Sequence, residues 1–311
     1  MTAEVRSRPP AETLTGASRL SGLRTKFHYL RGHPAFRKSP LRTLGRLLFW
    51  RVRCWLNLPA QIALPRWQAQ FYLPARWGGA GTTMIFATRE DYEVELAFLD
   101  RFISSGSVAI DAGANCGIYT VAMAKLVGSS GRVIALEPGE QAGQTLQRNI
   151  ELNGLDHVRL VRKALSDRDG SARLYHHGGP VGYSIAAGET EDGQSEEISS
   201  ISLDSLLQQE GLDRVDLLKM DIEGAEELAL RGAETMLTSS RPVIVFELNP
   251  SAAARFGLDT DGAWRHLKRF DYEFFTFDGA GKLCKLRSPP PEEQWEHCNI
   301  IAIHKDDHRS E

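Results

Sequence analysis

Cysteine is scarce in this sequence, and the way it is distributed excludes several protein classes. Four cysteines stand among 311 residues, with no CxxC pair and no histidine at zinc-finger spacing. They are too few to hold a chain of this length together by disulfides, so a stapled secreted scaffold is excluded. We expect a reducing, cytoplasmic setting and no zinc site.

Long apolar runs are also missing. No stretch of about 18 uncharged apolar residues occurs, and this excludes a membrane-spanning helix by the usual length criterion. The first 13 residues contain Glu4, Glu12 and two prolines where a signal peptide would need its apolar core. We therefore do not expect secretion. With 42% hydrophobic and 25% charged residues, the composition is that of a globular protein.

Acidic residues are nearly absent from the first quarter of the chain. Residues 1–80 hold 14 Lys and Arg against Glu4 and Glu12, a net charge of +12. The totals of 37 basic and 40 acidic residues leave 23 basic and 38 acidic residues for 81–311, or −15. The overall charge of −3 therefore hides two halves of opposite sign.

The basic part divides into a tail and a helical segment. Residues 1–38 are rich in Ser, Thr, Pro and Arg and are expected to be poorly ordered. Ser39 and Pro40 suit the start of a helix over 40–57, whose arginines Arg42, Arg46 and Arg53 share one stripe. We expect its apolar side to pack on the acidic core; the alternative is peripheral contact with an anionic membrane surface.

Short apolar runs follow this helix. Residues 62–64, 70–73 and 84–86 are separated by Pro and Gly and predict short strands. Together with the helix they form an accessory or lid segment over 39–89. A helical pattern over 93–102 then opens the main domain, which we place at 90–311.

A glycine loop follows the first strand of this domain. Residues 108–111 have buried-strand character and run into Gly113, Asn115 and Gly117, and helical periodicity returns over 118–127. Gly113 permits a sharp turn and close approach of a ligand, and Gly117 permits close packing at the helix start. The next strand, 132–136, ends at Glu137, where an acid can accept hydrogen bonds from two ribose hydroxyls.

The loop lacks the GxGxxG pattern of dinucleotide-binding proteins, because Gly113 and Gly117 are four residues apart. Asp111, a carboxylate at the strand end, suits a cationic ligand better than a pyrophosphate. The pattern favours a nucleoside ligand. The alternatives are an ordinary strand-to-helix turn and a nicotinamide-dependent oxidoreductase, which the missing pattern opposes.

Four acids end predicted parallel strands. Asp221 follows the strand predicted over 215–220, and Glu247 follows the one over 242–246. Asp111 and Glu137 end their strands in the same way. Open α/β sheets bind ligands at this edge, so we expect the four acids to face one crevice. Residues 170–202 interrupt the alternation and are interpreted as an insertion. Acids near Asp221 also suit the first turn of a helix whatever the function, and clustered carboxylates could bind Mg²⁺.

Six pieces, taken in order, resemble the FkbM-type methyltransferases that use S-adenosylmethionine. They are IDAGANCGIYT (110–120), ALEP (135–138), KALSD (163–167), SLDSLL (202–207), KMDIEGAEE (219–227) and NIIAIHK (299–305). The resemblance spans roughly residues 90–305, and residues 1–80 are matched only loosely. It implies an α/β fold: a doubly wound, mostly parallel, seven-stranded class I methyltransferase sheet with helices on both faces, extended here by a basic helical N-terminus.

The resemblance also implies a cofactor and a chemistry. S-adenosylmethionine would be held by Asp111, Gly113, Asn115 and Gly117 at its methionyl part, by Glu137 at its ribose, by the segment from Ala164 to Asp167 at its adenine, and by Asp221 near its sulfonium. Methyl transfer would go to a hydroxyl of a small molecule, sugar or lipid-linked acceptor, in bacterial secondary metabolism or glycan modification. The general base would be Asp221 or Glu223, with Lys219 and Glu247 as weaker choices.

We expect a small-molecule or glycan acceptor, no nucleic-acid partner and no metal, in the cytoplasm or peripherally at the inner membrane face. A third interpretation, besides the transferase and the oxidoreductase, is a non-catalytic membrane-associated protein on a degenerate methyltransferase core. The intact binding motifs argue against it.

Overall fold

An eight-stranded sheet forms the centre of the molecule. The computed structural model describes residues 30–77, 81–176, 183–184, 195–278, 281–291 and 299–310. The strand order is β13-β12-β14-β11-β10-β3-β4-β5. We predicted seven strands; the eighth, β13 (Leu283–Leu286), pairs antiparallel with β12 (Tyr272–Phe277) at one edge.

Five of the eight strands run parallel to one another. These are β3 (Val108–Ala112), β4 (Arg132–Leu136), β5 (Val158–Val161), β10 (Leu217–Met220) and β11 (Val243–Glu247). β14 (Asn299–His304) lies antiparallel between β11 and β12. β3 and β10 are neighbours although more than 100 residues separate them, so the strand order reverses beside β3, where such sheets bind ligands.

Helices cover both faces of the sheet, as the fold class predicts. Successive strand residues such as Ala109 and Ile110 enter two different hydrophobic clusters, because side chains alternate along a strand. α5 (Ile118–Val127) and α6 (Glu140–Leu152) pack on one face. On the other face lie α7 (Leu203–Glu210), α8 (Glu226–Arg231), α9 (Glu234–Ser239) and α11 (Gly262–Lys268). α10 (Pro250–Arg255) follows β11.

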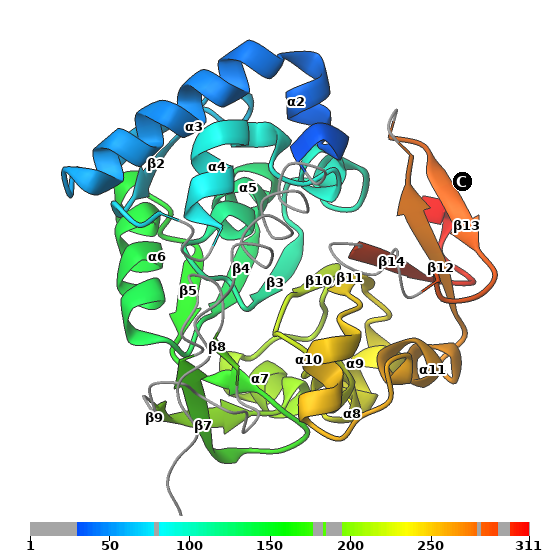
Figure 1. Cartoon of the computed structure of the whole chain (residues 1–311). Coiled ribbons are helices and arrows are strands. Elements are labelled where there is room, and N and C mark those ends of the chain that lie inside the picture. Colours follow the sequence, from blue (N-terminus) through cyan, green and yellow to red (C-terminus); the bar gives the residue numbers. More distant parts are fainter. Residues whose placement is uncertain are drawn as a thin grey trace, which may run out of the picture.

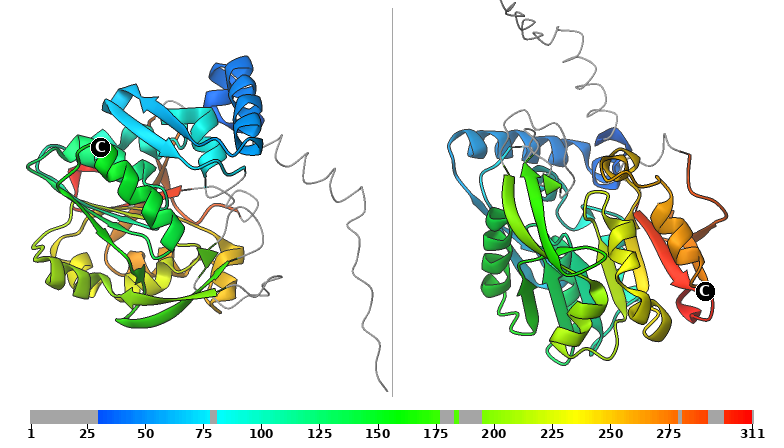
Figure 2. Two further views of the ribbon diagram at one scale, coloured as in Figure 1. Left: turned by 90° about the vertical axis from the view of Figure 1, so that its left-hand side faces the viewer. Right: turned by 90° about the horizontal axis from the view of Figure 1, so that it is seen from below.

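The segment interpreted as an insertion contributes to a second, smaller sheet. Its order is β6-β9-β7-β8, from β6 (Ala164–Leu165), β7 (Gly170–His176), β8 (Tyr183–Ser184) and β9 (Ser195–Ile201). Residues 177–182 and 185–194 of the predicted insertion lie outside the described residues. Figures 1 and 2 show this sheet at the opposite end of the molecule from the N-terminal helices.

The N-terminal segment differs from the prediction in two places. Residues 1–29 of the predicted tail lie outside the described residues, but Pro34–Lys38 form helix α2, where disorder was expected. His33 explains the order, since its Nδ1 accepts a hydrogen bond from the Ala35 amide (3.2 Å) and its Nε2 lies 3.1 Å from the Tyr92 carbonyl oxygen. The predicted helix is α3 (Pro40–Trp55), and β1 (Ala60–Leu64) pairs with β2 (Ala69–Leu73) as a hairpin.

The strand predicted over 84–86 is wrong, because these residues belong to helix α4 (Thr82–Thr88). Packing against α3 fixes the helix. The Trp50 ring stacks on the Phe86 ring with centroids 4.6 Å apart, and the Trp50 indole N–H donates to the Thr83 hydroxyl (3.2 Å). The helix expected over 93–102 is a pair of 3₁₀ turns (Glu95–Arg101) with a kink at Phe98.

Our expectation that the apolar side of α3 packs on the core is also wrong. Thr43 and Trp50 are its buried residues, whereas Leu41, Leu48 and Trp55 are among its most exposed. Figure 1 shows α3 along the outside of the molecule, over α4. Within the described residues, no helix combines the length and the apolar character needed to span a membrane.

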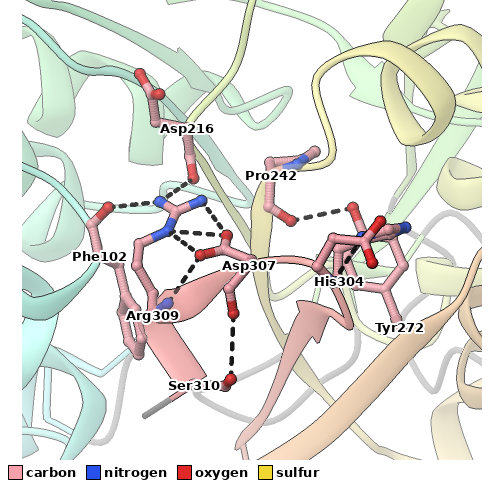
Figure 3. Close-up of polar contacts among 9 residues, drawn as sticks. Phe102, Asp216, Pro242, Tyr272, His304, Asp307, Arg309 and Ser310 are labelled. Atoms are coloured by element: carbon pink, nitrogen blue, oxygen red, sulfur yellow. Dashed lines mark hydrogen bonds and ion pairs between the residues drawn. The ribbon is translucent and has the colours of Figure 1, made fainter.

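The last described turn is fastened to the core by Arg309 (Figure 3). Its guanidinium donates to the Phe102 carbonyl oxygen (2.8 Å) and the Asp216 carbonyl oxygen (3.2 Å) and is paired with Asp307 at 2.6 Å. These contacts are at the amino ends of β3 and β10. They leave the carboxyl edge of the sheet free to form a cavity.

Candidate functional site

A cavity opens at the carboxyl ends of β3, β4 and β10. Most of the residues predicted from the sequence line it: Asp111, Gly113, Asn115, Glu137, Ala164, Lys219, Asp221 and Glu223. Other parts of its wall come from the N-terminal segment (Gly81, Ile85), from the residues that follow it (Tyr92, Glu93), from α5 (Tyr119) and from β7 (Leu174). The four strand-ending acids lie on four adjacent parallel strands in the order β11, β10, β3, β4, and three of them, Asp111, Glu137 and Asp221, line the cavity.

Gly113 is required by the protein's own backbone. Its φ is +75°, and a Cβ placed there would lie 1.9 Å from the carbonyl oxygen of Asp221. We expected this glycine to admit a ligand; the group that approaches it is the chain leaving β10. The Gly113 and Ala114 amides donate to the Leu136 carbonyl oxygen (3.0 and 2.9 Å), so the loop also joins β3 to β4.

Gly117 lies behind the cavity. Its φ is +93°, and a Cβ would meet Leu146 Cδ1 at 2.4 Å, in agreement with the predicted close packing at the helix start. It is not among the residues that line the cavity, although its neighbours Cys116 and Ile118 are, and it allows α5 to lie close to α6.

Asp111 is buried beneath the loop. The Thr120 hydroxyl donates to its Oδ2 at 2.5 Å. Burial raises the pKa of Asp111 to about 6, although the Thr120 hydrogen bond and the charge of Lys219 oppose the shift. The carboxyl group is therefore held rigidly in the floor of the cavity.

Glu137 is oriented by two backbone amides. The Asn115 N–H donates to Oε2 and the Gly139 N–H to Oε1, each at 2.8 Å. Burial raises the pKa of Glu137 to about 7, against both hydrogen bonds. Each carboxylate oxygen has a further lone pair, so this side chain can still accept two hydrogen bonds from a ligand.

Lys219 lies under the cavity, within β10. It is 1% exposed, its Nζ lies 3.9 Å from Asp221 Oδ2, and the ammonium is 5.1 Å from the centre of the Tyr119 ring. Burial lowers the pKa of Lys219, but the carboxylates around it, Asp221 foremost, outweigh burial and raise it. A buried cation therefore offsets part of the negative charge of the site.

Comparison with known proteins identifies the family. The model of the family described as "Methyltransferase FkbM domain" matches residues 111–274, which is more than half of the chain. The match runs from Asp111 before the glycine loop to Phe274 in β12. The chain belongs to the FkbM methyltransferase family. Membership implies S-adenosylmethionine as the cofactor.

Two curated relatives are fungal methyltransferases. Methyltransferase 1 of Beauveria bassiana is 30% identical over 147 residues, 41% of this chain and 59% of that protein. Methyltransferase sdnD of Sordaria araneosa is 26% identical over 162 residues, 42% of this chain and 62% of that protein. The chain thus spans about three fifths of the length of these relatives.

Among solved structures, the methyltransferase FkbM of Methylobacillus flagellatus KT is 13% identical to this chain, with a TM-score of 0.42. The alignment covers 93% of this chain and 71% of that one.

Two further predicted residues of this FkbM chain, like Gly117, are not among those that line the cavity. Asp167 was expected beside the adenine with Ala164, but it follows the short strand β6 and pairs with Ser166 (3.2 Å) and Arg168 (3.3 Å). Glu247 ends β11 but is not part of the described cavity wall. Glu247 is still close enough to Asp221 and Glu223 for their charges to raise its pKa.

Glu226 has the structural role that we had weighed against a functional one. Its side chain accepts hydrogen bonds from the Ile222 amide (3.0 Å) and the Gly224 amide (3.4 Å), just before α8 begins. Glu223 lines the cavity instead, with a φ of +55°, unusual for a residue other than glycine. In the turn after β10, Glu226 thus binds backbone amides of the turn itself, whereas Glu223 lines the cavity.

A second group of polar residues was missed by sequence reasoning. Glu93 Oε2 accepts hydrogen bonds from the Tyr119 hydroxyl (2.6 Å) and the Asn299 amide (2.8 Å). Glu93 and Asn299 are 206 residues apart, and Glu93 is at no strand end. Only the fold brings these residues together, on the side of the cavity nearest the N-terminal segment.

The described residues contain no group of three or more His, Cys, Asp or Glu arranged to hold a metal ion. The acids of this FkbM site are spread along four strands, and the oxygens of Glu226 and Glu137 accept hydrogen bonds from backbone amides.

The stability of the ligand-free chain should fall as the pH rises from about 5 to about 8. Burial raises the pKa of Asp111 to about 6, of Glu137 and Glu223 to about 7, and of Glu247 to about 9. Between the unfolded and folded pKa values the folded state binds more protons, so the stability present at low pH is lost on titration. Urea unfolding at constant ionic strength measures the slope, and a rise in stability over this window would contradict the assignment.

Proposed function

We propose that this chain transfers the methyl group of S-adenosylmethionine to a hydroxyl oxygen of a small-molecule, sugar or lipid-linked acceptor. The observation that carries the proposal is Glu137, whose carboxylate is fixed by two backbone amides at the end of β4, beside the glycine loop. Such a carboxylate suits the two hydroxyls of a ribose.

The cavity residues fit the cofactor part by part. Asp111, Gly113, Asn115 and Ala164 all line the cavity. In this proposal the first three would hold the methionyl part, and Ala164 would flank the adenine. Asp221 would lie near the positive sulfonium, to which an acidic site is complementary. When bound, S-adenosylmethionine supplies an electrophilic methyl group. The chain positions the acceptor in line with it and removes a proton.

Glu223 is the stronger of the two candidates for the general base. It lines the cavity, and burial together with the charges of Asp221 and Glu226 raises the pKa of Glu223 to about 7, close to the range in which a general base works best. Asp221, 3.9 Å from Lys219, remains the alternative.

The two weaker candidates are poorly suited to this role. Lys219 is buried with a raised pKa and therefore keeps its proton. Glu247 is outside the described cavity wall, and its pKa of about 9, which results from burial and neighbouring acids, keeps it protonated near neutral pH.

The acceptor would enter on the side formed by the N-terminal segment and the residues that directly follow it. Gly81, Ile85 and Tyr92 give this side an apolar wall, and Glu93 beside the Tyr119 hydroxyl gives it a hydrogen-bonding group. This combination suits a partly apolar molecule that bears a hydroxyl. Because cysteine use indicates a reducing setting, we place the reaction in the cytoplasm.

Incubation of the purified chain with methyl-labelled S-adenosylmethionine and an extract of the native organism should yield a labelled, alkali-stable product. Alkali stability distinguishes an ether from an ester. Glu223→Gln should reduce incorporation about 100-fold or more while cofactor binding in a calorimeter stays intact. Absence of cofactor binding at millimolar concentration by the folded wild-type chain would refute the proposal.

A further inference from the structure

Exposed large apolar side chains are concentrated in one segment of the chain. Of the ten such side chains among the described residues, nine lie between positions 41 and 77: Leu41, Leu44, Leu48, Phe49, Val52, Trp55, Leu56, Leu58 and Trp77. The tenth, Leu152, is at the end of α6. A contiguous group of this kind on a folded protein marks a surface that binds something.

Five of these side chains form a stripe along α3. Leu41, Leu44, Leu48, Val52 and Trp55 are spaced by three or four residues and therefore lie on one side of the helix. We call this set the outer stripe. Leu41 is 86%, Leu48 67% and Trp55 83% exposed.

The opposite side of α3 holds the helix in place. Trp50 is fully buried, with its ring stacked on Phe86 and its indole N–H bonded to Thr83. The Arg46 guanidinium donates to the Ala87 carbonyl oxygen (3.1 Å). The helix is thus anchored on α4, over which it lies in Figure 1, and the exposed outer stripe is on the side of the helix opposite these contacts.

The stretch of sequence that carries the outer stripe has charges of one sign. Residues 13–89 contain 13 Lys and Arg and no Asp or Glu. Arg42 and Arg51 are exposed on α3 itself, and Arg37 and Lys38 are exposed on α2 just before it. An apolar stripe ending in a tryptophan and bordered by cations is suited to an anionic, partly apolar surface.

We propose that the outer stripe of α3 docks on the surface of an anionic lipid bilayer. The helix would lie in the plane of the interface, with its leucines and Trp55 among the acyl chains and the arginines at the phosphates. A second copy of the chain is a poorer occupant, because pairing two stripes would bring two strongly cationic segments together. The acidic domain of the same chain does not cover the stripe, which is exposed on the side of α3 opposite its contacts with α4.

Sedimentation with lipid vesicles tests the proposal on the full chain. Binding to mixed phosphatidylcholine and phosphatidylglycerol vesicles should be at least about tenfold tighter than to phosphatidylcholine alone, and high salt should remove the difference. The double variant Leu48→Glu, Trp55→Glu should bind the mixed vesicles at least about tenfold more weakly. Both positions are exposed, so circular dichroism and the thermal midpoint should match those of the wild type.

Leu152→Glu is the matched control, since it makes the same change at an exposed leucine outside the segment and should leave vesicle binding unaltered. Three outcomes would overturn the proposal: no binding of the wild type to mixed vesicles, equal binding by the double variant, or a wild-type dimer in analytical ultracentrifugation that the double variant converts to a monomer. Methyl transfer enters none of these measurements, so their outcome is separable from the proposed activity.

Discussion

Glu137→Ala should weaken the binding of S-adenosylmethionine about 100-fold. The side chain is buried and oriented by the Asn115 and Gly139 amides, so its two oxygens are fixed before a ligand arrives. Loss of two hydrogen bonds to a charged acceptor, at about 1.5 kcal/mol each, accounts for a change of this size. Isothermal titration calorimetry with the cofactor and with its demethylated product measures it.

Asp167→Asn is the matched control for this experiment. Asp167 also lies after a strand of the same half of the molecule, but it is outside the described cavity wall, so the affinity should stay within about twofold of the wild type. Equal loss in both variants would place the cofactor elsewhere. Unchanged affinity in Glu137→Ala, with the thermal midpoint preserved, would refute the assignment of Glu137 to the ribose.

Gly113→Ala should lower the free energy of unfolding by about 3 kcal/mol or more, the combined effect of strain and overpacking. The new methyl group would lie 1.9 Å from the Asp221 carbonyl oxygen, so β10 and the glycine loop would have to separate. A positive φ of +75° adds the strain of a left-handed conformation. Urea unfolding measures the stability, and cofactor binding should be lost as well, because the cavity is formed between these two segments.

Gly154→Ala isolates the conformational part of this effect. Gly154 also has a positive φ, +59°, but a Cβ there would meet nothing within 4 Å. Its substitution should therefore cost only about 1 kcal/mol. If both variants lost the same stability, the close approach of Asp221 to Gly113 would be of no energetic consequence, contrary to the role that we give it.

The parallel strands and their acids could be predicted from the sequence because the signals are local. A buried parallel strand is a short continuous apolar run, and the residue at its carboxyl end necessarily lies at the carboxyl edge of the sheet. Asp111, Glu137 and Asp221 were placed correctly by this rule alone. Glu247 was placed at the right edge, yet the rule does not say whether a side chain there reaches the cavity.

The remaining errors concern residues whose state depends on distant partners. Residues 84–86 have the composition of a strand, but Trp50 stacks on Phe86 and fixes a helix. The 206-residue separation between Glu93 and Asn299 leaves no local trace of their hydrogen bond. The apolar pattern of α3 predicts that one side of the helix packs against an apolar environment. The pattern is the same whether that environment is the interior of the protein or another apolar phase.

Helix α4 contacts both α3 and the cavity. Its Phe86 stacks against Trp50 of α3, and its Ile85 forms part of the cavity wall. Any shift of α4 that accompanies docking of α3 is therefore also a shift in the wall against which a ligand binds. Thermodynamic reciprocity then requires that membrane docking and cofactor binding affect each other equally. Whatever factor a bilayer applies to the cofactor's affinity, the cofactor applies the same factor to the protein's affinity for the bilayer.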